Sequence, residues 1–162
     1  MIRLAQATDL EAIVEIYNQA VRAQFETADT EEVEMTDRLQ WFRDHTPNTY
    51  PVFVYEQNQQ VSGWVSLSPY RQGRKALQFT AEISYYVHNQ YKRQGIGSKL
   101  IQHAIQEART LQFKNLFAII LDKNKLSIHV LRKLGFQQWG HMPRIADFDG
   151  VECGHVYYGL RL

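Results

Sequence analysis

Val87–Leu100, VHNQYKRQGIGSKL, predicts the end of a strand, a basic turn with two glycines, and the start of a helix. The residues before it, FTAEISYYV (79–87), are rich in aromatic and β-branched side chains, which is typical of a half-buried strand. Apolar residues at helical spacing follow the turn. Free N–H groups and the positive end of the dipole at a helix start favour an anion, and Lys92, Arg93 and Lys99 add positive charge. We interpret the turn as a binding site for a pyrophosphate.

The two glycines do not by themselves identify a ligand. A Gly-x-Gly pair occurs in many turns and surface cations are usually solvated, so an ordinary solvated turn is the alternative. The dinucleotide fingerprint G-x-G-x-x-G is incomplete because Leu100 stands at its third glycine, and no G-K-[ST] of a P-loop occurs. A nucleotide therefore needs another mode of binding here.

The composition is that of an ordinary globular chain. Its 162 residues are 44% hydrophobic and 22% charged, which predicts a single domain over residues 1–162. The net charge of +1 gives no reason to expect nucleic acid or an anionic membrane as a partner. No apolar run reaches the ~18 residues of a membrane span, and the N-terminus lacks the apolar core of a signal peptide. The single cysteine, Cys153, excludes an internal disulfide, so we expect a passive buried thiol and a cytoplasmic location.

The rest of the chain predicts strands and helices in a mixed order. A capping box of Thr8 and Glu11 opens the first helix, an acidic loop covers 24–35, and Thr36 caps the second helix. We expect helices over 8–22, 36–45, 95–111 and 124–134, and strands over 2–5, 51–56, 61–67, 79–87, 115–121, 136–139 and 152–160. This order predicts an α/β fold with a mixed sheet covered by helices.

The basic turn resembles the signature of a known family. Lys92-Arg93-Gln94-Gly95-Ile96-Gly97 is similar to [QR]-x-x-G-x-[GA], which binds acetyl-CoA in the GNAT superfamily of N-acetyltransferases. Lysine at the usual Gln/Arg position lacks the fork of arginine, so we expect weaker or rearranged phosphate contact, shared by Arg93. The resemblance implies acetyl-CoA as the cosubstrate. It also implies these cofactor-binding residues: Tyr85, Tyr86, Val87, Lys92, Arg93, Gln94, Gly95, Ile96, Gly97, Ser98 and Asn124.

The same resemblance specifies the fold. A GNAT domain has a mixed, mostly antiparallel sheet that splays at its central parallel strand pair, is flanked by helices, and admits acetyl-CoA into the gap. Here Glu82–Val87 and Phe117–Leu121 would line that gap. The resemblance covers nearly the whole chain, from the pattern at Arg3–Asn18 to Gly140–Pro143, a segment that we expect to pack over the substrate pocket.

Glu82 is the candidate general base, because acetyl transfer requires a neutral amine. A carboxylate beside the gap is partly desolvated, which raises its pKa above the reference of ~4.3; a surface glutamate on an edge strand is the alternative. TAEISYYV (80–87) resembles T-[VA]-E-x-S-x-Y-V of the phosphinothricin-type amino-acid N-acetyltransferases, a branch of the GNAT superfamily. The base proposed for that branch falls on Glu82, and its tyrosine falls on Tyr86, a candidate substrate-binding residue.

Two arginines are candidates for contact with the acidic end of the substrate. Pro69–Gln78, PYRQGRKALQ, resembles the P-[FW]-R-x-R-x-A-Y loop of that branch, but it is one residue longer and has Leu77 in place of the tyrosine. By this resemblance either Arg71 or Arg74 meets a carboxylate bidentately, and a solvated loop is the alternative.

The last core helix departs from the pattern of the branch. Asn124–Ser127 resembles its N-x-x-S start, whose asparagine bonds the pantetheine arm, and Asn124 is equally a helix N-cap. Where the branch has histidine and glutamate, and other members a tyrosine nearby, this chain has Leu131 and Arg132. His129 points about 200° away from that position, so the group that protonates the leaving thiolate is unassigned. The six histidines show no spacing such as H-E-x-x-H, and we predict no metal.

These features together predict an acetyl-CoA-dependent N-acetyltransferase. By resemblance its partner is a small-molecule amine, an amino acid such as phosphinothricin, methionine sulfoximine or methionine sulfone. No cysteine or serine stands in a nucleophilic arrangement with a base, so we expect direct transfer in a ternary complex with Glu82 as base. The alternatives are a GNAT enzyme for a protein N-terminus or a polyamine, and a coenzyme A-binding module without catalysis. From the family alone we expect a homodimer.

Overall fold

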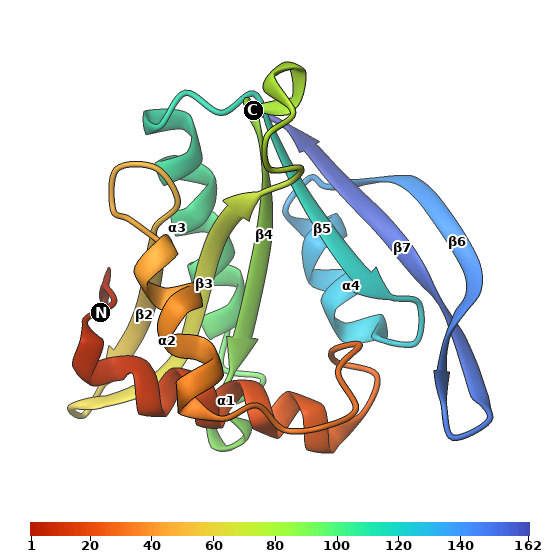
Figure 1. The fold of residues 1–162 in the computed structure, drawn as a ribbon, viewed down its shortest axis with the longest axis horizontal. Helices are drawn as coiled ribbons and strands as arrows, with labels where there is room; N and C mark the ends of the chain where they lie inside the picture. The colour runs from red at the N-terminus through yellow and green to blue at the C-terminus, as the bar shows by residue number, and fades with distance from the viewer.

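The computed structural model describes all 162 residues as one seven-stranded sheet with helices on both faces (Figure 1). The strand order is β1-β2-β3-β4-β5-β7-β6, and every neighbouring pair is antiparallel except β4–β5. The strands are β1 (Ile2–Leu4), β2 (Val52–Gln57), β3 (Gln60–Pro69), β4 (Thr80–Val87), β5 (Asn115–Leu121), β6 (Gln137–Phe148) and β7 (Val151–Arg161). The helices are α1 (Leu10–Ala23), α2 (Met35–Asp44), α3 (Ile96–Thr110) and α4 (Lys125–Lys133). None of these helices has the length and apolar character that a membrane crossing requires.

The central parallel strand pair is short. β4 and β5 pair at only three positions, of which the last joins Glu82 to Phe117. Beyond this point β4 stays paired with β3 as far as Val87, and β5 stays paired with β7 as far as Leu121. The two halves of the sheet therefore separate after Glu82, and β4 and β5 diverge toward the end of the molecule where α1 lies (Figure 1). The predicted mixed, splayed sheet is confirmed.

Each face of the sheet buries its own apolar cluster. α3 and α4 cover one face, where 18 buried side chains form the main core. α1 and α2 cover the other face, over a smaller cluster of 7 that includes Trp64. Successive residues of β3 point to opposite faces, so Trp64 packs with α1 and Val65 with α3. The apolar residues that predict helix α3 are all buried: Ile96, Leu100, Ile101, Ala104, Ile105 and Ala108.

The predicted capping box of the first helix is wrong. The chain makes a single 3-10 turn before α1, and Asp9, not Glu11, accepts a backbone N–H three residues back, from Gln6 (2.7 Å). Thr8 lies within the 3-10 turn and caps nothing. Asp9 takes this place because its carboxylate is also bound by Arg3, a contact between segments that the local pattern does not contain.

Two further boundaries differ from the prediction. Thr36 lies inside the first turn of α2, and Asp37 accepts the N–H of Glu34 (3.1 Å) at the helix start. β6 continues to Phe148, well past the predicted end at Trp139. Its sequence shows no regular apolar alternation because β6 is an exposed edge strand, and two register shifts against β7 interrupt its pairing.

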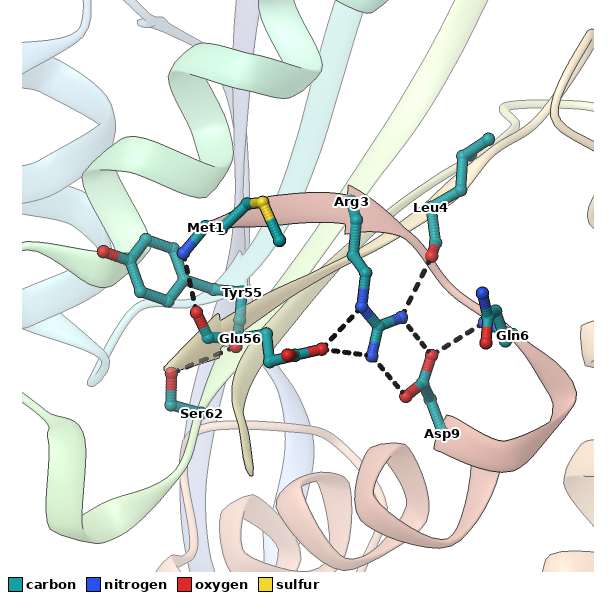
Figure 2. Close-up of polar contacts among 8 residues, drawn as sticks. All are labelled: Met1, Arg3, Leu4, Gln6, Asp9, Tyr55, Glu56 and Ser62. Atoms are coloured by element: carbon teal, nitrogen blue, oxygen red, sulfur yellow. Dashed lines mark hydrogen bonds and ion pairs between the residues drawn. The ribbon is translucent and has the colours of Figure 1, made fainter. Parts of the chain in front are cut away.

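Arg3 connects β1, β2 and the start of α1 (Figure 2). Its guanidinium donates to both oxygens of Asp9 (2.7 and 2.9 Å) and to Glu56 Oε2 (2.6 Å). Asp9 is buried and also accepts the N–H of Gln6. Burial by itself would raise the pKa of Asp9, but the hydrogen bonds from Arg3 and Gln6 and the Arg3 charge lower it below its ordinary value. This network holds α1 against the edge of the sheet.

Asp9→Asn should lower the free energy of unfolding at pH 7 by about 1.5–3 kcal/mol, the range for a hydrogen bond to a charged group. Because the folded-state pKa of Asp9 is depressed, its stabilisation is present above the unfolded value of ~3.9 and is lost as the pH falls through the folded value. Urea denaturation should therefore show a difference between wild type and variant at pH 7 that shrinks as the pH falls below the unfolded value of ~3.9. Asp37→Asn, at an exposed position at the start of α2, is the matched control. An equal loss in both variants would contradict the role of the Arg3 contact.

Candidate active site

The basic turn forms a free helix N-terminus. α3 starts at Ile96, and the Lys99 N–H donates to the Gly95 oxygen (3.1 Å) as the first bond of the helix. The N–H groups of residues 96–98 consequently have no partner within the helix. Gly95 has a φ of 77°, a left-handed conformation that disfavours any side chain. The geometry is that of the anion site that the sequence predicts.

A cavity, which we name the split cavity, extends from this turn into the gap between β4 and β5. Its walls come from the turn, both strands and α4. Every predicted cofactor-binding residue lines it except Gln94, whose amide donates to the oxygen of Gln90 (3.3 Å). Asn124 is the N-cap of α4, where its Oδ1 accepts the N–H of Ser127 (3.1 Å), and it also lines the cavity.

Lys92 has a partner that the sequence does not predict. Its Nζ lies 2.7 and 2.9 Å from the two carboxylate oxygens of Glu26, in the loop between α1 and α2. Both residues line the split cavity. Arg93 forms no ion pair, so its charge is available to an anion. Two features of the sequence are the only indications of this contact: the acidic character of the loop, and lysine at the position where Gln or Arg is usual.

A second cavity, which we name the Glu82 cavity, adjoins the split cavity. Glu82 is the last residue of β4 to pair with β5, and its carboxylate has no hydrogen bond or ion pair within the chain. Burial raises its pKa above the ordinary value, as the sequence predicts. The residues that line both cavities are Glu26, Ser84, Tyr86 and Ile119. An uncompensated carboxylate therefore lies beside the place where the two cavities meet.

The arginine in the Glu82 cavity is Arg38 of α2, which the sequence analysis missed. Its guanidinium carbon lies 4.2 Å from the ring centre of Tyr17 and 5.3 Å from that of Trp41. It forms no ion pair, and its guanidinium lies over the faces of these two rings. The available signal was the spacing of Arg38 and Trp41, which puts them on one face of a helix.

Arg71 and Arg74, the predicted substrate arginines, line a different cavity in the β3–β4 loop, which we name the loop cavity. Trp41 and Ser68 line both this cavity and the Glu82 cavity, so the two are neighbours with a shared wall. The structure thus does not bring Arg71 or Arg74 together with Glu82.

Aromatic and histidine side chains complete the Glu82 cavity. Tyr86 lies between the rings of Tyr17 and Trp64, with ring centres 5.0 and 4.9 Å away, and burial raises the pKa of its phenol. His155 of β7, also missed in the sequence, lines the cavity, and burial lowers its pKa. Both groups are therefore neutral at pH 7.

Gly140–Pro143 does not line any of the three cavities described. These residues belong to β6, and His141 contacts Asp122 instead (3.1 Å). The expectation that this segment packs over the substrate pocket is therefore not met in this chain. No three His, Cys, Asp or Glu side chains lie close enough together to hold a metal ion.

Comparison with known proteins identifies the family. Residues 10–136 match the profile described as the Acetyltransferase (GNAT) family. The chain belongs to the GNAT family. The predicted family, fold and enzyme class are thereby confirmed.

The relatives of this GNAT chain include amino-acid acetyltransferases. A Bacillus subtilis (strain 168) protein, named provisionally as a phosphinothricin acetyltransferase, is 41% identical over 150 residues, 92% of this chain and 91% of that protein. The L-methionine sulfoximine/L-methionine sulfone acetyltransferase of Salmonella typhimurium is 35% identical over 153 residues, 94% of this chain and 86% of that protein. The crystal structure of a phosphinothricin acetyltransferase from Sinorhizobium meliloti, in complex with AcCoA, has a TM-score of 0.94 and 28% identity, over 100% of this chain and 88% of that chain.

Tyr85 gives an independent indication that the split cavity of this GNAT chain receives a ligand. Its Oη is buried and has no hydrogen-bond partner. Burial raises the pKa of Tyr85 to about 12; the Ser127 hydroxyl is near enough to lower it slightly but does not complete a hydrogen bond. An unsatisfied buried hydroxyl costs about 1–3 kcal/mol, which a polar ligand in the cavity can recover.

Tyr85→Phe should raise the free energy of unfolding of the ligand-free protein by about 1 kcal/mol, because it removes an unsatisfied hydroxyl. Tyr158→Phe is the matched control: its Oη accepts from Arg132 Nε (2.9 Å), so its loss should destabilise the protein. Thermal or urea unfolding without ligand measures both. A loss of stability in Tyr85→Phe would show that the hydroxyl has a partner within the chain.

Proposed function

We propose that the chain transfers the acetyl group of acetyl-CoA to the amine of a small amino acid, in the class of phosphinothricin, methionine sulfoximine and methionine sulfone. The observation that carries this proposal is the position of Glu82, in a cavity that adjoins the split between β4 and β5. The names of the relatives with 41% and 35% identity support the substrate class.

In this proposal Glu82 is the general base. An amino acid carries an ammonium group at neutral pH, so a proton must leave before the nitrogen attacks the thioester. The raised pKa of Glu82 makes it a better base than an exposed carboxylate, and it accepts the proton directly or through a water molecule. Transfer is direct, because the one cysteine, Cys153, is buried with a raised pKa and lines neither cavity.

The open edge of β4 supplies hydrogen-bond donors for the thioester. Beyond Glu82, the backbone groups of β4 that would pair with β5 have no strand partner. An N–H group on this edge stabilises the carbonyl oxygen as it gains charge, in the manner of an oxyanion hole. Leu131 is buried in the main core and offers no donor to the departing sulfur. The neutral phenol of Tyr85 lines the split cavity and has no hydrogen-bond partner within the chain.

Glu82→Gln should lower kcat by about 10²-fold or more, because an amide cannot accept the proton. The kcat/KM of the wild type should fall as the pH drops below the raised pKa of Glu82, and this limb should be absent in the variant. Release of free thiol from acetyl-CoA, with phosphinothricin or methionine sulfoximine as acceptor, measures both. The affinity for acetyl-CoA should not change. Wild-type kcat in the variant across the pH range would exclude Glu82 as the base.

Arg38 is the residue that we assign to the carboxylate of the acceptor. In the Glu82 cavity, Arg38 then binds the carboxylate of the amino acid and Glu82 lies near its ammonium group. The Tyr17 ring, 4.2 Å below the guanidinium, restricts Arg38 before the substrate arrives, which reduces the entropic cost of binding. Arg71 and Arg74 lie in the loop cavity, beyond the wall that Trp41 and Ser68 form.

Arg38→Gln should raise the KM for phosphinothricin about 30-fold, which corresponds to about 2 kcal/mol for lost hydrogen bonds to a charged group. The KM for an amine that lacks a carboxylate should change much less. Arg71→Gln and Arg74→Gln are matched controls with smaller expected effects. If either control raises the KM more than Arg38→Gln does, the loop arginine recognises the carboxylate, as the sequence resemblance implies.

A short peptide and a polyamine represent the two alternative classes of acceptor, and both are tested in the same assay. Preferential turnover of either would overturn the amino-acid assignment and leave the reaction intact. Binding of acetyl-CoA without turnover of any amine would instead indicate a coenzyme A-binding module. The homodimer and the cytoplasmic location stay predictions.

A further inference from the structure

Glu26 occupies a position common to both cavities of the proposed active site. It lies in the loop over 24–34, between α1 and α2, and lines the split cavity and the Glu82 cavity alike. Both oxygens of its carboxylate contact Lys92 Nζ, and the two side chains are only 35% and 28% exposed. This ion pair joins the acidic loop to the turn that forms the anion site.

The loop on either side of Glu26 is held in place. Phe25 has a φ of 58°, a left-handed conformation that a bulky residue rarely adopts. Its ring packs against Phe148, with 4.8 Å between ring centres. On the other side Thr27 is buried, and its hydroxyl shares a hydrogen bond with Tyr17 Oη (2.9 Å). Packing on both sides of Glu26 maintains this strained conformation and thereby fixes the direction of the Glu26 side chain. Backbone strain of this kind is typical of functional positions.

The geometry points to Glu26 as an acceptor-binding residue that Lys92 holds until acetyl-CoA binds. This inference rests on the proposed function. The pyrophosphate of acetyl-CoA at the turn competes with Glu26 for Lys92, because both are anions beside one ammonium group. Once Lys92 turns to the phosphate, the Glu26 carboxylate is free to bind the ammonium group of the amino acid in the Glu82 cavity.

The charges of the Glu82 cavity support this occupant. Its charged side chains are Glu26, Glu82 and Arg38. Glu82 must give up contact with the ammonium group as it takes the proton, whereas Glu26 can keep the substrate nitrogen in place. In the ligand-free protein Glu26 is neutralised by Lys92, so the cavity attracts the ammonium group less strongly. The two substrates should therefore bind cooperatively, with acetyl-CoA favouring the amino acid.

Calorimetric binding of coenzyme A, the unreactive product, tests the first half of this inference. Glu26→Gln should bind coenzyme A about fivefold more tightly than the wild type at low salt, because Lys92 no longer has a competing carboxylate, and added salt should reduce the gain. The gain should be absent when Lys92→Gln is already present, in a double-mutant cycle. Glu31→Gln, an exposed change in the same loop without a hydrogen-bond partner, should bind like the wild type. Equal affinity of wild type and Glu26→Gln would overturn the competition.

Binding of methionine sulfoximine, with and without saturating coenzyme A, tests the second half. In the wild type coenzyme A should tighten acceptor binding about fivefold, and by linkage the acceptor should tighten coenzyme A by the same factor. In Glu26→Gln this coupling should be lost and the acceptor should bind more weakly to the coenzyme A complex. Coupling that persists in Glu26→Gln would overturn the inference and leave the proposed function intact. A wild type that binds no coenzyme A would overturn the proposed function itself.

Discussion

Hydrogen bonding between β4 and β5 stops at the pair of Glu82 and Phe117, and the backbone groups beyond it need other partners. The neighbouring pairs β3–β4 and β5–β7 continue past this point, so within the sheet interior β4 and β5 expose unpaired edges only along this gap. Polar backbone that faces a gap is costly unless a ligand or water satisfies it. The anion site at the start of α3, the half-buried carboxylate of Glu82 and the unsatisfied hydroxyl of Tyr85 all lie along this gap. The interruption of the ladder thus determines where substrates meet.

The charged groups of the site come from four separate segments. Glu82 is on β4, Lys92 on the turn before α3, Glu26 on the loop after α1, and Arg38 on α2. The strand and the turn are part of the sheet and its main core, whereas the loop and α2 pack over the smaller cluster. The cofactor side is therefore built on the more deeply packed half of the protein. The acceptor side depends on segments whose positions are fixed by a few aromatic contacts.

The sequence predicts the parts of the site that are local in the chain. The strand before the turn, the glycine at a positive φ and the cap at Asn124 each follow from neighbouring residues, and the desolvation of Glu82 follows from its place in that strand. Arg38 and Glu26 could not be found in this way, because their roles come from contacts with Tyr17 and Lys92, far along the chain. The predicted cap of the first helix was wrong for the same reason, because the contact between Arg3 and Asp9 joins separate segments. β6 was underestimated because an exposed edge strand lacks the alternating pattern of a half-buried one.

The wall between the Glu82 cavity and the loop cavity has a consequence for substrate range. Trp41 and Ser68 line both spaces, and the indole ring is the larger of the two side chains in this shared wall. A smaller residue at position 41 would join the two spaces, and longer acceptors could then reach Arg71 and Arg74 without any change at Glu82 or in the cofactor turn. The same chain thus contains a route by which evolution or protein engineering could widen its repertoire in a single step.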